Sequence, residues 1–291
     1  MADLCWRARS VGPIARGDGR TFLERAFQAE RIGGEGVLTA YFAPVYEARR
    51  QPDAEFSMPV RPRPADLVVA DGGIVLRVLP DGSAEPYPDR AAIEAMPVAQ
   101  PLAWMRPEEL FFLQVQGSGV LTFEDGRRTK VLYAAHNGRP FAGIANPMRD
   151  RGLLPRDNTS GDAIRNWLAA HRGPEADEIM RLNPRYAFFR LAPDDGKPPV
   201  GAANIPLPAG RAIAIDPAFH TYGQLMWVDA EAPILAGAFP AYRRLAMALD
   251  TGGAIKGEVR ADLYLGEGAA AGAEAGRVRH TLRLYRLVPR P

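Results

Sequence analysis

Three aspartates in the last third of the chain each adjoin a short apolar run of the kind that forms a buried strand. Asp216 follows Ala-Ile-Ala-Ile, Asp250 follows Leu-Ala-Met-Ala-Leu, and Asp262 precedes Leu-Tyr-Leu. A single strand-end aspartate usually only closes a turn by accepting backbone hydrogen bonds. Three such carboxyls, together with Lys256 and the glycines of segment 251–257, indicate a site where carboxyl groups act on a ligand.

The segment Asp250-Thr251-Gly252 also matches the Asp-Thr-Gly signature of aspartic proteases. Those enzymes use two aspartates that share one proton, so a single copy requires a symmetric dimer with the motifs facing each other. The sequence contains no second copy, and a large insertion would crowd the dimer axis. A dimeric aspartic protease is therefore the least favoured interpretation.

Other residue types that often carry chemistry give weaker signals here. Gln116, Gly117 and Ser118 combine an amide and a hydroxyl with flexible glycine, which by itself indicates little. The four histidines lie far apart and lack metal-site spacing, and we expect His136 to be a hydrogen-bonded structural imidazole. We expect no metal and no cofactor.

Strands are the main elements expected to hold these residues. A capping box at Thr21 and Glu24, with apolar positions through Ala29, predicts a helix that ends at Gly33 and Gly34. Further helices are expected over 162–173, capped by Asp162, and over 175–182, and the Ala/Gly segment 266–276 is expected to be a loop. Strand-like runs occupy residues 36–46, 67–70, 74–79, 111–116, 119–123, 130–135, 211–216, 224–230, 245–250 and 281–287.

Composition limits the classes of function. The 291 residues are nearly half hydrophobic, which allows a sizeable core in one large or two ordinary domains. Lys plus Arg (36) nearly balances Asp plus Glu (34), and a formal charge of +2 without a basic run argues against a nucleic-acid partner. No apolar run approaches the roughly 20 residues that span a bilayer. Cys5 is the only cysteine, which excludes an intramolecular disulfide but leaves the redox compartment open.

Several blocks of the sequence resemble the membrane-bound lytic murein transglycosylase A family. Residues 212–228 and 245–268 resemble the three-aspartate (3D) domain that closes members of this family, and Asp216, Asp250 and Asp262 match its three aspartates. Upstream, the segments 38–50, 111–119, 133–141 and 183–191 are similar to successive blocks of the family-specific domain, in the same order. The resemblance runs from about residue 36 to the C-terminus.

The resemblance implies a mainly β fold. It implies a six-stranded double-psi β-barrel built from N- and C-terminal segments, here residues 1–55 and 205–291. A second β-rich domain, residues 56–204, is inserted between them, with a sugar-binding groove at the junction. Proline-rich residues 59–64 and the Pro/Gly link 194–210 agree with an insertion at these points.

The resemblance also implies a reaction with a single carboxyl group. Asp262 would protonate the bridging oxygen between N-acetylmuramic acid and N-acetylglucosamine, and then take the proton of the muramoyl 6-hydroxyl as this attacks the anomeric carbon. The product is a 1,6-anhydro ring, and water is not consumed. A general acid must hold its proton near neutral pH, so we expect burial and the charge of Asp250 to raise the pKa of Asp262. Equally, Asp250 could hold the glycine loop instead.

The same resemblance implies that residues other than Asp262 contact the sugar. Gln116, Gly117 and Ser118 match the family's Gln-Gly-Ser-Gly, and Thr39 and Tyr41 match part of its Thr-Gly-Tyr-Tyr. This chain departs from the latter motif, because alanine stands at 40 and phenylalanine at 42. Asp216 is expected to form a turn or the wall of the groove, and with Asp250 it completes the predicted substrate-binding set.

Partner and location follow from the substrate. The expected partner is a peptidoglycan glycan strand. We expect the protein to act on it as a monomer in the bacterial periplasm. The family is usually anchored to the outer membrane as a lipoprotein. The first residues lack a secretory signal, and Cys5 lacks a lipobox, so either the signal has been trimmed from this chain or a tether is absent. A non-catalytic wall-binding protein of the expansin type is the main alternative function.

Overall fold

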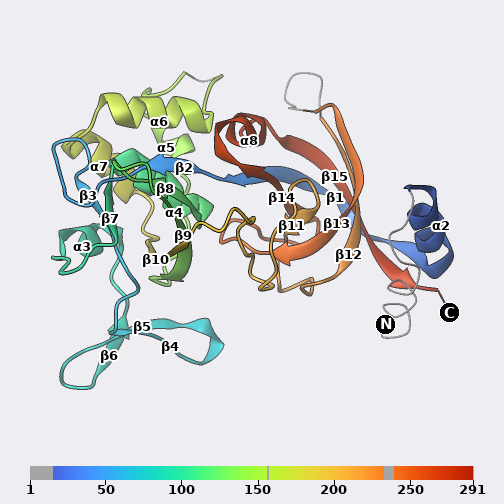
Figure 1. Ribbon diagram of the computed structural model, residues 1–291, viewed down its shortest axis with the longest axis horizontal. Coiled ribbons are helices and arrows are strands. Elements are labelled where there is room, and N and C mark those ends of the chain that lie inside the picture. Colours follow the sequence, from blue (N-terminus) through green and yellow to red (C-terminus); the bar gives the residue numbers. More distant parts are fainter. Residues whose placement is uncertain (1–15, 156, 233–238, 291) are drawn as a thin grey trace. The chain divides into compact units, whose positions relative to one another are not determined.

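The computed structural model describes residues 16–155, 157–232 and 239–290 (Figure 1). It divides into two compact units. The barrel unit comprises Met1–Ala40, Val200–Tyr264 and Val278–Pro291, and the insert unit comprises Tyr41–Pro199 and Leu265–Arg277. Cys5 lies outside the described residues. In the described ranges no helix is both long and apolar enough to cross a bilayer.

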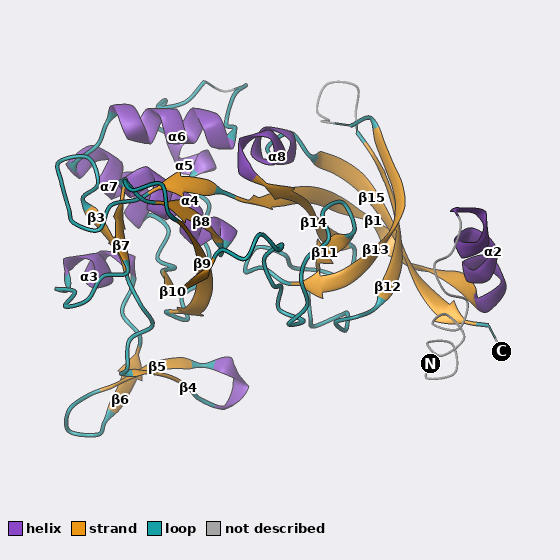
Figure 2. Ribbon diagram, viewed as in Figure 1, coloured by secondary structure: helices purple, strands orange, loops and turns teal. Residues whose placement is uncertain are grey.

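Six strands close the barrel, and this confirms the predicted mainly β fold with an inserted β-rich domain. Their order around the barrel is β1-β14-β11-β13-β12-β15, and β11 runs parallel to β13. Figure 2 shows these strands as orange ribbons joined by loops. The strands are β1 (Phe27–Ala43), β11 (Ala212–Ala214), β12 (Leu225–Glu231), β13 (Ala241–Asp250), β14 (Arg260–Glu267) and β15 (Arg279–Pro289).

Side chains alternate between the inside and the outside of the barrel along these strands. In β12, Met226, Val228 and Ala230 are buried while the residues between them are partly exposed. In β15, Leu282 and Leu284 are likewise fully buried. Because successive side chains of a strand point to opposite faces, the period of two in the sequence fills the barrel interior with apolar groups.

The N-terminal helix begins and ends earlier than its sequence pattern predicts. Helix α2 covers Arg16–Ala26, so Thr21 lies inside the helix and does not cap it, and the chain enters β1 at Phe27 instead of remaining helical to Gly33. Residues 27–32 pair one by one with β15, from Phe27 opposite Pro289 to Ile32 opposite Leu284. The prediction was wrong here because pairing with a distant strand outweighs local helix propensity.

The insert unit contains three small sheets. Its four-stranded sheet has the order β10-β9-β8-β2, formed by β10 (Ala187–Pro193), β9 (Arg128–His136), β8 (Gly119–Thr122) and β2 (Val45–Glu47). Strand β3 (Met58–Val60) pairs with β7 (Ala103–Met105), and the third sheet contains β4 (Leu67–Val69), β5 (Val75–Val78) and β6 (Ala84–Pro86), with the 3-10 turn η1 (Asp71–Gly73) between β4 and β5. The strands predicted near residues 67, 74, 119 and 130 are thereby confirmed.

The insert unit also contains helices. They are α3 (Arg90–Ala95), α4 (Pro107–Gln116), α5 (Ala145–Asp150), α6 (Gly161–Ala170), α7 (Pro174–Arg181) and α8 (Gly268–Ala275). The predicted helices near 162 and 175 are confirmed as α6 and α7, although Ser160 caps α6 in place of Asp162, its side chain accepting from the amide of Ala163 at 3.2 Å.

Two segments of the insert unit have a different structure from the predicted one. Residues 111–116 form the second half of helix α4 and not a strand, and 268–275 form helix α8 and not a loop. Pro107 at the first turn of α4 and left-handed Gly117 at its end are ordinary helix boundary signals. In α8, alanine is the commonest residue, and alanine has the highest helix propensity.

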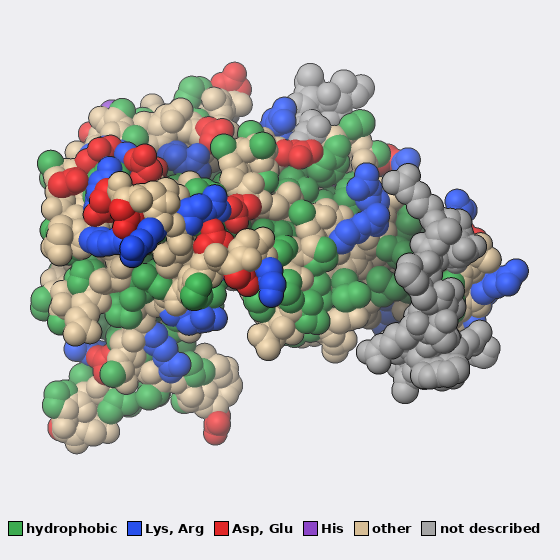
Figure 3. Space-filling view, viewed as in Figure 1, with side chains coloured by type: hydrophobic (Ala, Val, Ile, Leu, Met, Phe, Trp, Pro, Cys, Tyr) green, Lys and Arg blue, Asp and Glu red, His purple; other side chains and the backbone are tan. Residues whose placement is uncertain are grey.

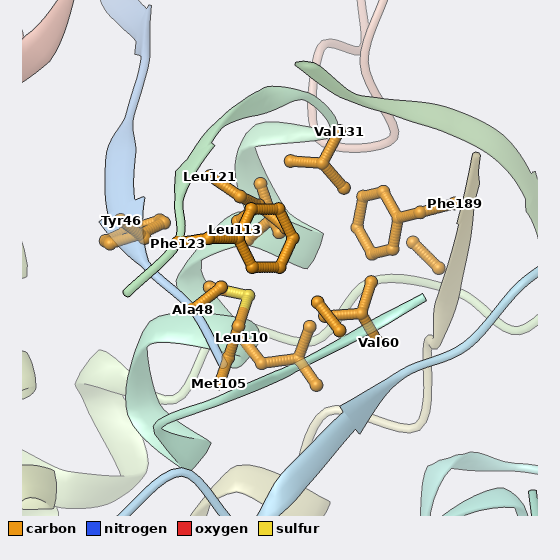
Figure 4. Packing of buried hydrophobic residues seen from close by; sticks show 12 residues of the cluster. Tyr46, Ala48, Val60, Met105, Leu110, Leu113, Leu121, Phe123, Val131 and Phe189 are labelled. Carbon is orange, nitrogen blue, oxygen red and sulfur yellow. The ribbon is translucent and has the colours of Figure 1, made fainter. Parts of the chain in front are cut away.

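Helix α4 lies between two apolar clusters. Leu110 and Leu113 pack with Leu121, Val131 and Phe189 of the sheets (Figure 4). Phe111 points into a separate cluster formed mainly by α5, α6 and α7. A helix can present neighbouring residues to opposite sides in this way, so packing on both sides fixes the position of its C-terminal end.

Charges of both signs are interspersed on the face of the insert unit seen in Figure 3. Arg106 illustrates how they pair, because its guanidinium contacts Glu47 at 2.7 Å, Glu55 at 2.6 Å and Glu109 at 3.3 Å. This network connects β2, the loop before β3 and helix α4 within the unit.

Candidate active site

Strand register places two of the three aspartates on either side of one residue. Ala214 of β11 lies opposite Asp250 of β13 and opposite Asp262 of β14. Neighbouring strands are about 4.8 Å apart, so the two aspartate backbones are separated by about 10 Å. Asp250 ends its strand as predicted, whereas Asp262 lies inside β14 and not before it.

The carboxyl of Asp262 is bound by the opposite end of the sequence. Oγ1 of Thr39, on β1, donates a short hydrogen bond to Oδ1 of Asp262. Nη2 of Arg260 in turn donates to Oγ1 of Thr39 at 2.8 Å. Residues 260 and 262 project from the same face of β14, because side chains two apart on a strand share a face. Three side chains from two strands therefore form one connected group.

Burial raises the pKa of Asp262. Although the residue keeps part of its surface exposed, protein atoms surround the carboxyl closely, and loss of hydration is the largest influence on its pKa. The hydrogen bond from Thr39 and the charge of Arg260 act in the opposite direction, and the charge of Asp250 adds a smaller increase. The raised pKa favours the protonated carboxyl that a general acid needs.

Gly36 allows the contact between β1 and β14. A β-carbon at position 36 would lie 1.7 Å from the backbone oxygen of Val259, so only glycine leaves room for this approach. The amide of the next residue, Val37, donates to that same oxygen at 3.3 Å. The glycine thus permits the strand contact that brings Thr39 beside Asp262.

Asp250 contacts the linking segment that precedes the barrel strands. Its Oδ1 accepts a hydrogen bond from the backbone N–H of Ala202 at 3.0 Å. Gly201 lies against the same strand end, since a β-carbon there would meet the backbone oxygen of Leu249 at 2.5 Å. Asp250 therefore ties residues 201–202 to the end of β13.

Asp216 organises the loop that leads into β14. Its carboxylate accepts from the amides of Gly257 at 2.9 Å and Ala218 at 3.2 Å, and Lys256 lies 3.7 Å away. These contacts, led by the bond from Gly257, lower the pKa of Asp216. The residue is 4% exposed and stays ionised in a turn, so it has the structural role foreseen for a strand-end aspartate.

The same loop is tied down at two further points. The hydroxyl of Thr251 donates to the backbone oxygen of Ile215 at 2.9 Å. A ring nitrogen of His220 lies 2.7 Å from the backbone oxygen of Glu258. Because these contacts hold both ends of the loop, Arg260 and Asp262 enter the barrel in a fixed register.

In the insert unit, the segment 116–118 comprises the last residue of helix α4 and the two residues after it. Gly117 is in the left-handed region with φ of 87°, and its N–H closes the helix on the oxygen of Leu113 at 2.8 Å. The hydroxyl of Ser118 accepts from the amide of Tyr133 at 3.2 Å, and the side-chain oxygen of Gln116 lies 3.5 Å from the amide of Phe42. All three residues are partly exposed.

Position 42 departs from the expected tyrosine, and the structure gives a local reason for an apolar ring there. A β-carbon on Gly272 of α8 would lie 2.7 Å from the Phe42 ring, so the helix backbone packs directly on this side chain. Tyr41, which precedes it, is half-buried.

The histidines are hydrogen-bonded to backbone groups. Nδ1 of His136 accepts from the amide of Gly138 at 2.8 Å, and burial lowers the pKa of His136 to about 4, so this imidazole is neutral. His171, His220 and His280 each lie 2.7 Å from a backbone oxygen. Among the described residues no group of histidine, cysteine and carboxylate side chains could hold a metal ion.

Comparison with known proteins agrees with this geometry. The protein-family model of the MltA specific insert domain matches residues 37–190, and the family model of the 3D domain matches residues 211–288. Membrane-bound lytic murein transglycosylase A of Vibrio cholerae is 32% identical over 94% of this chain and 72% of its own length. The chain belongs to the membrane-bound lytic murein transglycosylase A family.

Solved structures of the family are similar throughout the chain. The membrane-bound lytic murein transglycosylase of Agrobacterium tumefaciens has a TM-score of 0.84 with 36% identity, over 95% of this chain and 80% of that one. MltA of Neisseria gonorrhoeae has a TM-score of 0.81 with 29% identity, over 99% and 82%. MltA of Escherichia coli, solved with bound chitohexaose, has a TM-score of 0.77 with 30% identity, over 94% and 79%.

Arg260 was not among the site residues predicted from the sequence. Its position two residues before Asp262 on an apolar strand was the available signal, because that spacing puts both side chains on one face. The contact of Thr39 with Asp262 had no such local signal, since the two residues are 223 positions apart.

Proposed function

We infer that this protein is a lytic transglycosylase that acts on peptidoglycan glycan strands. The observation that carries the inference is the raised pKa of Asp262, a partly exposed carboxyl hydrogen-bonded by Thr39 in a chain of this family. A raised pKa lets this carboxyl keep its proton to higher pH than an ordinary aspartate, whose pKa is near 4.

The proposed reaction divides into two proton transfers by the same carboxyl group. Asp262 first gives its proton to the oxygen that bridges N-acetylmuramic acid and N-acetylglucosamine, and the bond from the anomeric carbon to that oxygen breaks. The muramoyl 6-hydroxyl then bonds to the anomeric carbon, and its proton returns to Asp262. The product carries a 1,6-anhydro ring, and neither water nor a cofactor is needed.

A one-carboxyl mechanism agrees with the roles of the other aspartates. Ordinary glycosidases need two carboxyls, because one serves the leaving group and the other activates water or attacks the sugar. The Asp216 carboxylate is committed to the amides of Gly257 and Ala218, and Asp250 accepts from Ala202. Here the substrate supplies its own nucleophile in place of a second carboxyl.

We assign substrate binding to Gln116, Gly117, Ser118, Thr39 and Tyr41. The Ser118 oxygen accepts from a backbone amide, so its hydroxyl hydrogen can be donated to a sugar oxygen. Gln116 presents an amide group that can bond to an acetamido group in the same way. Asp216 and Asp250 support the site by fixing the backbone around Asp262.

The decisive experiment incubates purified sacculi with the wild type and with Asp262→Asn, followed by mass spectrometry of the released muropeptides. The wild type should release anhydro-muropeptides, and the variant should be slower by about a thousandfold or more, because an amide keeps the shape but cannot cycle a proton. Asp229→Asn, on the barrel strand β12, is the matched control and should retain activity.

Other outcomes would point to other functions. Peptide fragments would indicate a protease, and binding without products would indicate a wall-binding protein. More than a tenth of wild-type release by Asp262→Asn would exclude Asp262 as the acid.

The proposed location follows from the substrate. Peptidoglycan lies outside the cytoplasmic membrane, so we place the protein in the bacterial periplasm, acting as a monomer. The names of the Vibrio cholerae and Escherichia coli relatives describe those proteins as membrane-bound. A tether to the outer membrane in the full-length precursor would agree with those names.

A further inference from the structure

A hydrogen-bonded chain connects Arg260 to the carboxyl of Asp262. Nη2 of Arg260 donates to Oγ1 of Thr39 at 2.8 Å, and Oγ1 of Thr39 donates to Oδ1 of Asp262. The other arm of the guanidinium is held by backbone, because Nη1 donates to the oxygens of Ala261 at 2.5 Å and Val37 at 3.4 Å. Arg260 therefore approaches Thr39 from a fixed direction.

The single hydrogen of the Thr39 hydroxyl then has a defined direction. A guanidinium only donates hydrogen bonds, so Arg260 occupies a lone pair of Oγ1 and the hydroxyl hydrogen points to Oδ1 of Asp262. The positive charge of Arg260 polarises the hydroxyl and strengthens the bond that it donates. An oxygen that accepts such a bond is the less basic of the two carboxyl oxygens, so the proton of the acid resides on Oδ2.

We propose that Arg260 is a positioning residue that acts through Thr39: it directs the Thr39 hydroxyl to Oδ1 of Asp262 and so reserves Oδ2 for both proton transfers. This inference rests on the proposed transglycosylase function. In the first step Oδ2 gives its proton to the bridging oxygen, and in the second step it takes the proton of the 6-hydroxyl. Oδ1 keeps its hydrogen bond from Thr39 throughout, so the carboxyl does not rotate between the steps.

Charged groups on three strands determine how Asp262 responds to substitution. Arg260 on β14 lowers the pKa of Asp262, and Asp250 at the end of β13 raises it. Burial lowers the pKa of the Arg260 guanidinium, and the charge of Arg279 on β15 acts in the same direction. Removing the charge of Arg260 should therefore raise the pKa of Asp262 further, and Asp250→Asn should lower it.

The first test measures kcat, KM and their pH dependence on soluble glycan strands. Arg260→Met should lower kcat by roughly tenfold to a hundredfold, the range for one hydrogen bond to a charged group, with KM changed less than about twofold. Activity requires protonated Asp262, so the alkaline limb of kcat/KM should move to higher pH in Arg260→Met and to lower pH in Asp250→Asn. Arg286→Gln removes an exposed arginine of β15 and should leave all three quantities unchanged.

A double-mutant cycle separates positioning from simple structural support. If Arg260 acts on kcat through Thr39, Arg260→Met should cost little further activity in a Thr39→Val background. Thr39→Ser keeps the hydroxyl and should restore most of the activity lost in Thr39→Val. Additive losses of kcat, or a folded Arg260→Met with unchanged kcat, would overturn the proposal. Where Arg260→Met is unstable, Arg260→Leu, which also lacks an N–H donor, takes its place in the cycle.

Direct titration of the Asp262 carboxyl by carbon-13 NMR, assigned with Asp262→Asn, does not depend on cleavage. Its pKa should rise in both Arg260→Met and Thr39→Val, and equal pKa values in wild type and both variants would overturn the proposed contact. Absence of anhydro products from the wild type would instead overturn the proposed function and leave this titration as the test of the contact.

Discussion

Asp216 and Asp262 are distinguished by the direction in which the protein shifts their pKa. Backbone amides and Lys256 lower the pKa of Asp216, which therefore stays ionised. Burial raises the pKa of Asp262, which keeps its proton to higher pH. When the surroundings shift the pKa values of two carboxyls in opposite directions, the one with the lowered pKa suits a structural role and the one with the raised pKa suits acid chemistry.

At the residue scale we also expect the segment after α4 to contribute binding energy without contributing to proton transfer. Replacement of Gln116 or Ser118 by alanine should weaken binding of a chitooligosaccharide by about 1 to 2 kcal/mol each, because a hydrogen bond to the sugar is removed. The measurement is titration calorimetry in the Asp262→Asn background, which prevents cleavage. The exposed residues Gln51 and Ser83 provide matched alanine controls that should bind normally. Unchanged affinity of the double variant would remove both residues from the site.

At the scale of elements, the close approach of β1 to β14 determines whether the carboxyl of Asp262 can accept the hydrogen bond from Thr39. Gly36→Ala would place a methyl group 1.7 Å from the backbone oxygen of Val259, so one of the two strands must move. We expect a loss of stability of about 2 to 3 kcal/mol or more, the range for overpacking, together with a large loss of activity.

Gly34→Ala is the matched control for this change, because nothing lies within 4 Å of a β-carbon at position 34. Denaturant unfolding should show Gly34→Ala within about 0.5 kcal/mol of the wild type. If the two variants were equally stable, the close approach of β1 to β14 would be contradicted.

At the scale of the whole molecule, the site carries a cost in stability that depends on pH. The folded protein keeps a proton on Asp262 at pH values where the unfolded chain, with a pKa near 4, has released it. Unfolding then releases a proton, so stability falls as pH rises from the unfolded pKa to the folded one. Asn cannot ionise, so Asp262→Asn should melt at a higher temperature than the wild type at pH 7, by about 2 to 4 °C for each kcal/mol.

Thermal unfolding between pH 4 and pH 8 tests this sign. The advantage of Asp262→Asn should shrink toward pH 4, where the folded carboxyl is protonated and about half of the unfolded carboxyls are protonated as well. Asp216→Asn provides the opposite case, because a lowered pKa contributes stability above the unfolded pKa that is lost as pH falls through the folded one. A lower melting temperature for Asp262→Asn at pH 7 would show that this carboxyl does not oppose folding.

The sequence by itself determined the β-rich fold with an inserted domain, most strand positions and the family. Alternation along β12 and β15 and the spacing of the aspartates are local patterns, so they can be read without knowing the fold. The proposal that Asp262 is the acid came from the blocks that resemble the family, because each motif is continuous in the chain.

Tertiary structure alone decided which groups surround that acid and where some elements begin. Residues 27–32 became a strand because β15 pairs with them. Thr39 reaches Asp262 across 223 positions only because barrel closure brings β1 beside β14. The raised pKa of Asp262 has the same origin, since desolvation depends on atoms that pack around a carboxyl and not on its neighbours in sequence.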